Sequence, residues 1–283
     1  MELSDLKVFK QVVESGGIIK AAEKLNRVPS NVSMRIKKLE DELGKALFIR
    51  EKNRLRISTA GEQLLVYSQK ILTLAQQAID ELNGEQTKGT LTIGAMEAVA
   101  ATKLANPLAL FHQSHPHIEL NLITGASGIL IEQVLTGALD MAFVADPIPD
   151  PRLNIIEIYE EHLVLVSALN HKKIKSPNDL EDEQSLLGFN HRCAYRTRLT
   201  EWLTQAGKAS KVIEISSYHA LLSCIAAGMG VGIVPESLLA LYPFKENLKT
   251  HPLPAKWRKC NTAIIWRHDS VTSSMKVFSE SCR

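Results

Sequence analysis

Short polar groups and cations gather in one stretch of this chain, between Pro29 and Leu43, at spacings that would place them on one face of a helix. Polar groups near the start of such a helix can hydrogen-bond to base edges in DNA, and cations along it can pair with phosphates. The members of this face are Ser30, Asn31, Ser33, Met34, Arg35, Lys37 and Lys38. They indicate recognition of a DNA duplex, although a solvated amphipathic helix would carry a similar face.

Two helices joined by a tight turn are needed to position this face. Pro29 suits the first turn of a helix, where its missing N–H costs nothing. Gly16 is typical of the end of an earlier helix, whose N-cap we expect at Ser4. Inward-facing apolar residues are predicted at Leu6, Phe9, Val13, Ala21, Ala22, Leu25, Val32, Ile36, Leu39 and Leu43. The pattern is that of a helix-turn-helix.

Residues 47–59 predict two short strands around a basic turn. Leu47, Phe48, Leu55 and Ile57 are available to pack, and Arg50, Lys52, Arg54 and Arg56 would be exposed. In a winged helix, such a hairpin lies beside the recognition helix, where arginines reach the DNA backbone or the minor groove. A charged hairpin that only improves solubility is the alternative.

The next stretch, from residue 60 to about residue 82, has a helical pattern with spacings of four and three. The repeating positions are Leu64, Ser68, Ile71, Ala75, Ala78 and Leu82. This pattern predicts a coiled-coil seam between two chains, and a helix packed within its own chain is the competing interpretation. The polar segment 83–90 then marks a domain boundary.

Beyond this boundary strands and helices alternate, which predicts an α/β domain with a largely parallel sheet. A first unit has strands at 91–95, 118–124 and 141–144, with helices at 103–112 and 129–135. A strand pair near 155–159 and 163–166 leads into a second unit. That unit has strands at 186–189, 212–215 and 231–235 and helices at 198–205 and 221–227. A strand at 262–266 returns to the first unit before a closing helix.

Composition and charge limit the possible classes. The chain has 283 residues, 45% of them hydrophobic, which is enough for a sizeable core and two or three domains. Residues 1–60 hold 13 Lys and Arg against 8 Asp and Glu, so the basic end would bind a polyanion, although ordinary fluctuation of surface charge is the alternative.

Charges in MELSDLKVF stand where a signal peptide would have its apolar region, and no stretch reaches the length of a membrane span. Four scattered cysteines suit a reducing compartment, so we expect a cytoplasmic protein.

Many of these residues together resemble the N-terminal signature of LysR-type transcriptional regulators. The matching positions are Leu6, Phe9, Val12, Gly16, Ala21, Ala22, Leu25, Val32, Ser33, Ile36, Leu39, Glu40, Leu43, Gly44, Leu47, Phe48, Arg50, Thr59, Ala60 and Gly61. Gly17 and Ile19 stand where the family usually has hydroxyl residues that touch the DNA backbone. The G-x-L-D segment at 137–140, the run AAGMGVGIVP at 226–235 and the region near Trp266 extend the resemblance over the whole chain. A further resemblance, to a YofA-like subgroup of the family, lies in residues 93–105, 189–196 and 216–230.

The resemblance implies an α/β multidomain protein. We expect a winged helix-turn-helix at residues 1–60, a dimerising linker helix at 61–83, and a two-lobed effector domain with a periplasmic-binding-protein-like fold. Lobe I would hold residues 90–161 and 263–283, and lobe II would hold residues 162–262. The resemblance also implies two recognition helices on dyad-symmetric promoter DNA, in a homodimer or homotetramer whose shape the effector changes.

A small-molecule effector should bind between the lobes, at strand ends and helix N-termini, where free N–H groups attract anions. The candidates are Met96, Glu97, Thr102, Gly125, Ser127, Tyr195, Arg196, Ser217, Tyr218 and His219. A polar or anionic metabolite would suit Ser127, Ser217 and Arg196. Glu97 could instead receive an amine or be a structural cap, and each candidate could simply cap a helix or pack between lobes.

Several other motifs support weaker interpretations. The glycine run 228–232 follows a helix and precedes a strand, the wrong order for a dinucleotide fingerprint. His112, His115 and His117 flank a proline without a carboxylate or thiolate cluster, so we predict a solvated turn and no metal. Cys193 matches in position the reactive cysteine of peroxide-sensing family members, but Trp202 stands where the resolving cysteine would be. We therefore expect an inert thiol.

Taken together, the sequence predicts a DNA-binding regulator and neither an enzyme nor a transport protein. No acid and base pair or activated nucleophile suggests catalysis, and no cofactor is expected. Base reading is assigned to Ser30, Asn31, Ser33 and Met34. The DNA backbone is assigned to Arg35, Lys38, Arg50 and Arg54, with an affinity that falls steeply with salt. Further partners would be its own promoter region and RNA polymerase.

Overall fold

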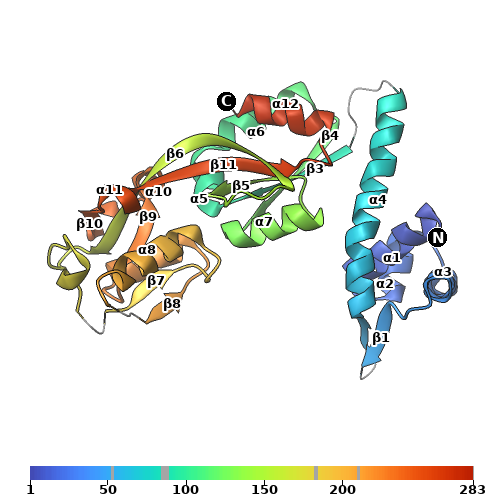
Figure 1. Cartoon of the computed structure of the whole chain (residues 1–283), viewed down its shortest axis with the longest axis horizontal. Coiled ribbons are helices and arrows are strands. Elements are labelled where there is room, and N and C mark those ends of the chain that lie inside the picture. Colours follow the sequence, from blue (N-terminus) through green and yellow to red (C-terminus); the bar gives the residue numbers. More distant parts are fainter. Residues whose placement is uncertain (52–53, 84–88, 182–183, 209–210, 283) are drawn as a thin grey trace. The chain divides into compact units, whose positions relative to one another are not determined.

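The computed structural model of the chain describes residues 1–51, 54–83, 89–181, 184–208 and 211–282 (Figure 1). The chain divides into two compact units, one of N-terminal helices with a hairpin and one of the strands and helices from residue 89 onward. Each unit has a hydrophobic core of its own. The predicted boundary at 83–90 falls mostly on residues 84–88, which lie outside the described part.

The first unit begins with three helices, α1 (Leu3–Ser15), α2 (Ile18–Lys24) and α3 (Pro29–Leu43). Their fully buried apolar residues are Leu6, Val8, Phe9, Val12, Ala21, Ala22, Val32, Ile36 and Leu39. The predicted inward face of α3 therefore holds for its first three members. Leu43 was expected inside but is 39% exposed, because it is the last residue of the helix before Gly44.

The ends of these helices follow the sequence signals in part. Gly16 ends α1 in the left-handed region, at φ 69°, and Pro29 lies in the first turn of α3. The predicted N-cap at Ser4 is wrong, because α1 begins at Leu3 with Glu2 as its cap. The hydroxyl of Ser4 instead accepts a hydrogen bond from Arg35 at 3.0 Å.

A hairpin of β1 (Phe48–Glu51) and β2 (Arg54–Ile57) follows and leads directly into α4 (Thr59–Asn83). Gly61 lies where α4 meets the base of the hairpin. A Cβ atom at this position would lie 2.3 Å from the carbonyl oxygen of Leu47, so no larger residue fits without a shift. Ser58 supports the junction, since its hydroxyl donates to Ala46 and accepts from the N–H of Gly61.

The predicted seam of α4 lies partly against its own unit. Leu64 and Ile71 pack on the core of the first unit, and Ser68 is fully buried. Among the described side chains of α4, the exposed apolar ones are Tyr67 at 63%, Leu74 at 64%, Ile79 at 51% and Ala78. Leu82 has a side chain outside the described part of the helix. Among the described residues, no helix is long and apolar enough to span a membrane.

The second unit is built on a sheet whose first three strands are parallel, as predicted. They are β3 (Gly89–Ala95), β4 (Ile118–Thr124) and β5 (Met141–Ala145). Helices α6 (Ala105–Ser114) and α12 (Ser273–Ser281) cover one face, where Phe111 and Phe278 meet edge to face. Helix α7 (Ser127–Thr136) covers the other face (Figure 1). A short helix, α5 (Glu97–Thr102), was not expected.

Two long strands connect this part to the next. The pair of strands expected at 155–159 and 163–166 is one continuous strand, β6 (Leu153–Ala168). It pairs with β11 (Lys259–Arg267) along its first part and with β9 (Gly232–Pro235) and β10 (Leu248–Pro252) along its last part. All three pairings are antiparallel, so the sheet is only partly parallel.

We call residues 89–161 and 263–282 lobe I and the described residues of 162–262 lobe II. Lobe II adds the parallel pair β7 (Leu186–Gly188) and β8 (Val212–Glu214). Its helices are α8 (Ala194–Thr204), α9 (Tyr218–Ala226), α10 (Glu236–Leu241) and α11 (Ala255–Arg258), with single 3-10 turns at Pro177–Asp179 and Lys245–Asn247. The sequence pattern did not predict α10, α11 or β10.

Candidate nucleic-acid interface and interlobe site

The predicted base-reading residues share the outer face of α3. Ser30, Ser33 and Met34 are exposed, Met34 at 63%. Asn31 is half-buried, and its side-chain oxygen accepts a hydrogen bond from Arg27 at 3.3 Å. The face therefore presents hydroxyls, an amide and a thioether, groups that can meet donors, acceptors and thymine methyls in a major groove.

Arg35 has a different environment from the one predicted. Its Nη1 lies 2.6 Å from Oδ1 of Asp5, a residue of α1 that is 1% exposed. Lys38 is mostly exposed and lies 3.7 Å from the other oxygen of Asp5 and 3.8 Å from Glu42. The guanidinium of Arg35 thus pairs with a buried carboxylate through Nη1, and its contact with the DNA backbone stays a prediction. The sequence offered no signal for Asp5.

The hairpin is attached to α3 by a carboxylate. Oε1 of Glu40 accepts the backbone N–H groups of Leu47 and Phe48, at 2.7 and 3.2 Å. Phe48 in turn packs on Phe9 with ring centroids 5.5 Å apart. Arg50 and Arg54 occupy β1 and β2 as predicted, but their side chains lie outside the described residues, as does Lys52.

Between the lobes, Glu97 and Tyr218 are in contact. Glu97 is the first residue of α5 in lobe I, and Tyr218 is the first residue of α9 in lobe II. Oε1 of Glu97 accepts the backbone N–H of Tyr218 at 3.3 Å. The N-terminus of α9, where an anion was expected, thus faces a carboxylate of the chain itself.

Other candidates from lobe I do not present free polar groups to the interlobe boundary. Met96 and Ser127 are buried, and the Ser127 hydroxyl lies 3.1 Å from the sulfur of Met96 while it accepts the N–H of Ala145. Thr102 donates to the carbonyl of Ala98 within α5. Gly125 donates its N–H to Ala95. The Ser127 hydroxyl therefore has internal partners, and its contact with an effector stays a prediction.

The candidates from lobe II differ in how far they are buried or already bonded to other groups of the protein. Tyr195 and Tyr218 are buried, at 2% and 6% exposed, and burial raises the pKa of both phenols well above the usual value. Arg196 donates to Glu214 at 2.6 Å and to the carbonyl of Phe189 at 3.0 Å. Ser217 is the N-cap residue of α9, but its side chain makes no capping hydrogen bond to the helix. His219 is exposed.

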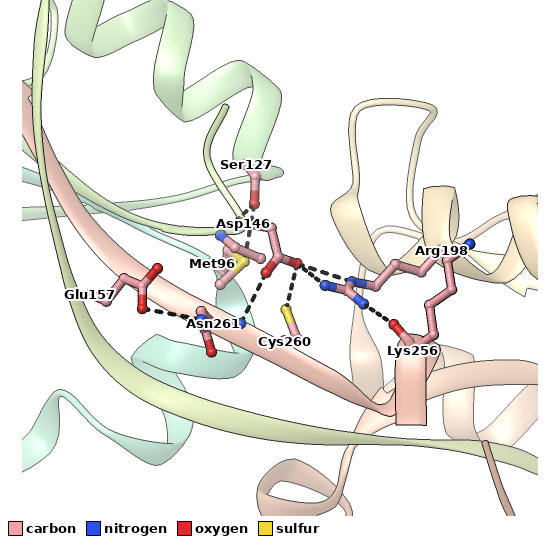
Figure 2. A network of polar contacts seen from close by, with 9 residues as sticks. Met96, Ser127, Asp146, Glu157, Arg198, Lys256, Cys260 and Asn261 are labelled. Carbon is pink, nitrogen blue, oxygen red and sulfur yellow. Dashed lines mark hydrogen bonds and ion pairs between the residues drawn. The ribbon is translucent and has the colours of Figure 1, made fainter. Parts of the chain in front are cut away.

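A polar network that the sequence did not reveal joins the lobes at the end of β5 (Figure 2). Asp146 accepts Arg198 Nε at 3.0 Å, the Cys260 thiol at 3.1 Å and the N–H of Asn261 at 3.0 Å. Arg198 also donates to the carbonyl of Lys256. Asp146 has a positive φ of 41°, which is uncommon for a residue with a side chain. The only sequence signal for a role of Asp146 between the lobes was its position just after a predicted strand.

A second pair of contacts crosses between the lobes. The N–H of Gly128 in α7 donates to the carbonyl of Arg192 at 3.2 Å, and the Arg192 guanidinium pairs with Glu132 of α7. Each lobe therefore contributes side chains that are already engaged with the other.

Three of the four cysteines have a raised thiol pKa. Burial raises the pKa of Cys193 and Cys260, and it raises the pKa of Cys282 to about 11. Cys193 caps the N-terminus of α8 without being activated by it. This agrees with the prediction of an inert thiol.

The other motifs have local explanations. His115 ends α6 and stacks on Phe111, with ring centroids 4.8 Å apart. Within the described parts of the chain, no three His, Cys, Asp or Glu residues are grouped as metal ligands. In the glycine run, a Cβ atom at Gly230 would lie 2.3 Å from the carbonyl oxygen of Ser185, so the run permits close packing before β9.

Two family models together match nearly the whole chain. Residues 3–62 match "Bacterial regulatory helix-turn-helix protein, lysR family", and residues 84–283 match "LysR substrate binding domain". The chain is also similar to curated regulators along its full length. It is 35% identical to the HTH-type transcriptional regulator SoxR of Arthrobacter sp. (strain TE1826), over 100% of this chain and 97% of that one. It is 35% identical to the HTH-type transcriptional regulator CzcR of Bacillus anthracis, over 98% and 96%.

Solved structures share the fold. A full-length OxyR variant from Pseudomonas aeruginosa superimposes with a TM-score of 0.78 at 23% identity, covering 100% of this chain and 95% of that one. CbnR, a LysR family transcriptional regulator, superimposes with a TM-score of 0.69 at 22% identity, covering 100% and 98%. The architecture predicted from the sequence is thus confirmed, whereas the YofA-like subgroup stays a prediction.

Proposed function

This chain belongs to the LysR family of transcriptional regulators. We therefore propose that it binds promoter DNA through α3 and the β1–β2 hairpin, and that it responds to a small molecule bound between lobes I and II. As a member of this family it is a DNA-binding regulator with an effector domain and not an enzyme. The proposal concerns which residues perform each task.

The observation that carries the proposal is the composition of the outer face of α3. Ser30, Ser33 and Met34 are exposed there, and Asn31 lies beside them, so all four can reach base edges. Lys37 is exposed on the same helix, has no ion pair among the described residues, and joins Lys38 as a phosphate contact. Arg50 and Arg54 keep their proposed role on the backbone. Arg35 holds α3 against α1.

Two copies of the chain would present two such faces. The exposed apolar positions Tyr67, Leu74 and Ala78 follow one another at spacings of seven and four, so they form a stripe along α4. We call these three residues the α4 stripe. A homodimer joined through the α4 stripe would hold two recognition helices on a dyad-symmetric site, and two dimers would make the homotetramer expected from the sequence.

We also propose where the regulator acts and which partners it has. The regulator acts in the cytoplasm, where its DNA is. Its own upstream region is the first target to test, and contact with RNA polymerase would convert DNA binding into altered transcription. A change in lobe closure on effector binding would alter the shape of the assembly and so the bend of the bound DNA.

Binding of the full-length protein to its own upstream DNA, measured over a range of salt concentrations, tests this function. We expect sequence-selective binding that weakens steeply with salt. Lys37→Ala should reduce the slope against log salt by about 1, and Ser33→Ala should reduce discrimination between target and scrambled DNA. Lys276→Ala, on α12 of the second unit, is the matched control.

Equal affinity for target and scrambled DNA, with Lys37→Ala and Ser33→Ala both silent, would contradict the proposed face. Circular dichroism of each variant separates this outcome from a loss of folding.

A further inference from the structure

Glu97 lies at the boundary of the two lobes, where its carboxylate faces the N-terminus of α9. Within the described part of the chain, its side chain accepts one hydrogen bond, the 3.3 Å contact from the backbone N–H of Tyr218, which is longer than usual for a charged acceptor. Among the described residues, no lysine or arginine pairs with this carboxylate. A partly buried carboxylate without a cation is costly, so a bound cation would be stabilised there.

The cations near the same boundary have the opposite status. Arg192 pairs with Glu132, Arg196 with Glu214 and Arg198 with Asp146. Lys103, directly after α5, lies 3.2 Å from Glu161. An anionic ligand would have to displace a carboxylate from one of these four cations, whereas a cationic ligand would find the charge of Glu97 available.

The surroundings of Glu97 also suit a cation. Phe189 and Tyr218 pack together with ring centroids 4.7 Å apart, and aromatic faces attract ammonium groups. Tyr195 is 2% exposed, and its hydroxyl has no hydrogen-bond partner in the described part of the chain. Burial raises the pKa of Tyr218 most, and Tyr195 and Glu97 add to this rise. A neutral phenol can accept a hydrogen bond from an ammonium.

We propose that Glu97 is the specificity-determining residue of the interlobe site and that the effector presents a protonated amine to it. The inference rests on the proposed function, in which the effector binds between the lobes. The ammonium would replace the long contact from Tyr218 as the partner of Glu97. Because that contact links α5 to α9, its replacement would change the connection between the lobes, which is how occupancy of the site reaches the rest of the assembly.

The isosteric variant Glu97→Gln separates charge from shape. The amide oxygen of glutamine can still accept the N–H of Tyr218, so the variant keeps the cap and removes only the charge. Glu97→Asp keeps the charge on a shorter side chain. Glu201→Gln, an exposed carboxylate on α8, is the matched control for loss of one negative charge.

The test measures thermal unfolding and calorimetric binding of the full-length protein with probe pairs that differ only in the sign of one end. The pairs are tyramine and 4-hydroxyphenylacetate, histamine and imidazole-4-acetate, and agmatine and 4-guanidinobutyrate. We expect saturable binding of at least one amine and none of its carboxylate partner. Glu97→Gln should weaken that binding about tenfold or more, Glu97→Asp should weaken it less, and Glu201→Gln should leave it unchanged.

Three outcomes would overturn the inference. They are binding of the carboxylate members in preference to the amines, amine binding that Glu97→Gln leaves intact, and no saturable binding of any amine. If the protein prefers the carboxylates and Arg196→Gln abolishes that binding, the effector still binds between the lobes. Only the proposal that the effector is an amine is then excluded. Failure of the DNA-binding function would be visible separately, as loss of salt-dependent binding to the upstream DNA in the same preparations.

Discussion

The guanidinium Nη1 of Arg35 lies 2.6 Å from the buried Oδ1 of Asp5, and this ion pair joins α3, the proposed recognition helix, to α1. The same nitrogen lies 3.0 Å from the Ser4 hydroxyl. A cation that the sequence suggests for DNA thus has a structural task in the protein itself. The orientation of α3 in the first unit therefore depends partly on charge as well as on its apolar face.

Removing this pair should cost stability. Arg35→Ala leaves Asp5 buried with only Lys38 at 3.7 Å, so the free energy of unfolding should fall by about 1–3 kcal/mol. The double variant Asp5→Ala/Arg35→Ala should be less destabilised than the sum of its two single variants. Urea unfolding of all three checks this, with Lys37→Ala as the control. Strictly additive effects would mean that the ion pair contributes nothing.

The junction of hairpin and α4 should not tolerate a side chain at Gly61. A Cβ atom there would lie 2.3 Å from the Leu47 carbonyl oxygen and 2.7 Å from Ile57. Gly61→Ala should lower the free energy of unfolding by about 1–3 kcal/mol and weaken DNA binding, because the hairpin must shift. Gln63→Ala, exposed on the same helix, should change neither. Wild-type melting temperature and DNA affinity in Gly61→Ala would contradict the close approach.

Association should depend on the α4 stripe. Leu74→Glu places a charge on an apolar position that is 64% exposed in the single chain, so the variant should sediment as a smaller species than the wild type and bind DNA more weakly. Leu241→Glu, at a similarly exposed leucine of α10, should sediment like the wild type. An unchanged sedimentation profile for Leu74→Glu would remove the α4 stripe from the interface.

The network around Asp146 should hold the two lobes together. Asp146→Asn keeps a residue that tolerates a positive φ but removes the charge that faces Arg198, whose side chain is 19% exposed. We expect a loss of about 1–2 kcal/mol in the free energy of unfolding and faster amide exchange at the start of α8. Asp150→Asn breaks the exposed pair with Arg152 and should have little effect. Equal exchange in both variants would argue against an interlobe role.

Stability should fall on mild acidification because of His251. This residue is 1% exposed, accepts the N–H of Ile174 and contacts Ser167, and burial lowers its pKa to about 4. The folded protein therefore resists protonation that the unfolded chain accepts near pH 6.5, so stability is full above pH 6.5 and is lost as the pH falls toward 4. The loss should be about 1–3 kcal/mol. His251→Gln should show a flatter pH profile by urea unfolding, and an identical slope would exclude His251 as the cause.

Local patterns in the sequence determined most of the elements. The spacing of Val32, Ile36 and Leu39 specified the inner face of α3, and Gly16 specified where α1 ends. Largely alternating apolar residues indicated β3 and β4, and an unbroken apolar run indicated β5. These signals work because helix and strand periods depend on neighbours within a few residues. The residues on the outer face of α3 followed from the same period, so the candidate DNA-reading set was predictable.

Only the tertiary structure decided which polar groups are free. Asp5 and Arg35 are 30 residues apart, and Glu97 and Tyr218 are 121 residues apart. Ser127 matched the expected position at a helix start, yet its hydroxyl faces Met96. The period of a helix or strand determines which face of the element a side chain occupies, but it does not determine which groups lie opposite that face. Partners are selected by long-range packing, so only the folded chain shows that Glu97 accepts the N–H of Tyr218 and pairs with no cation among the described residues.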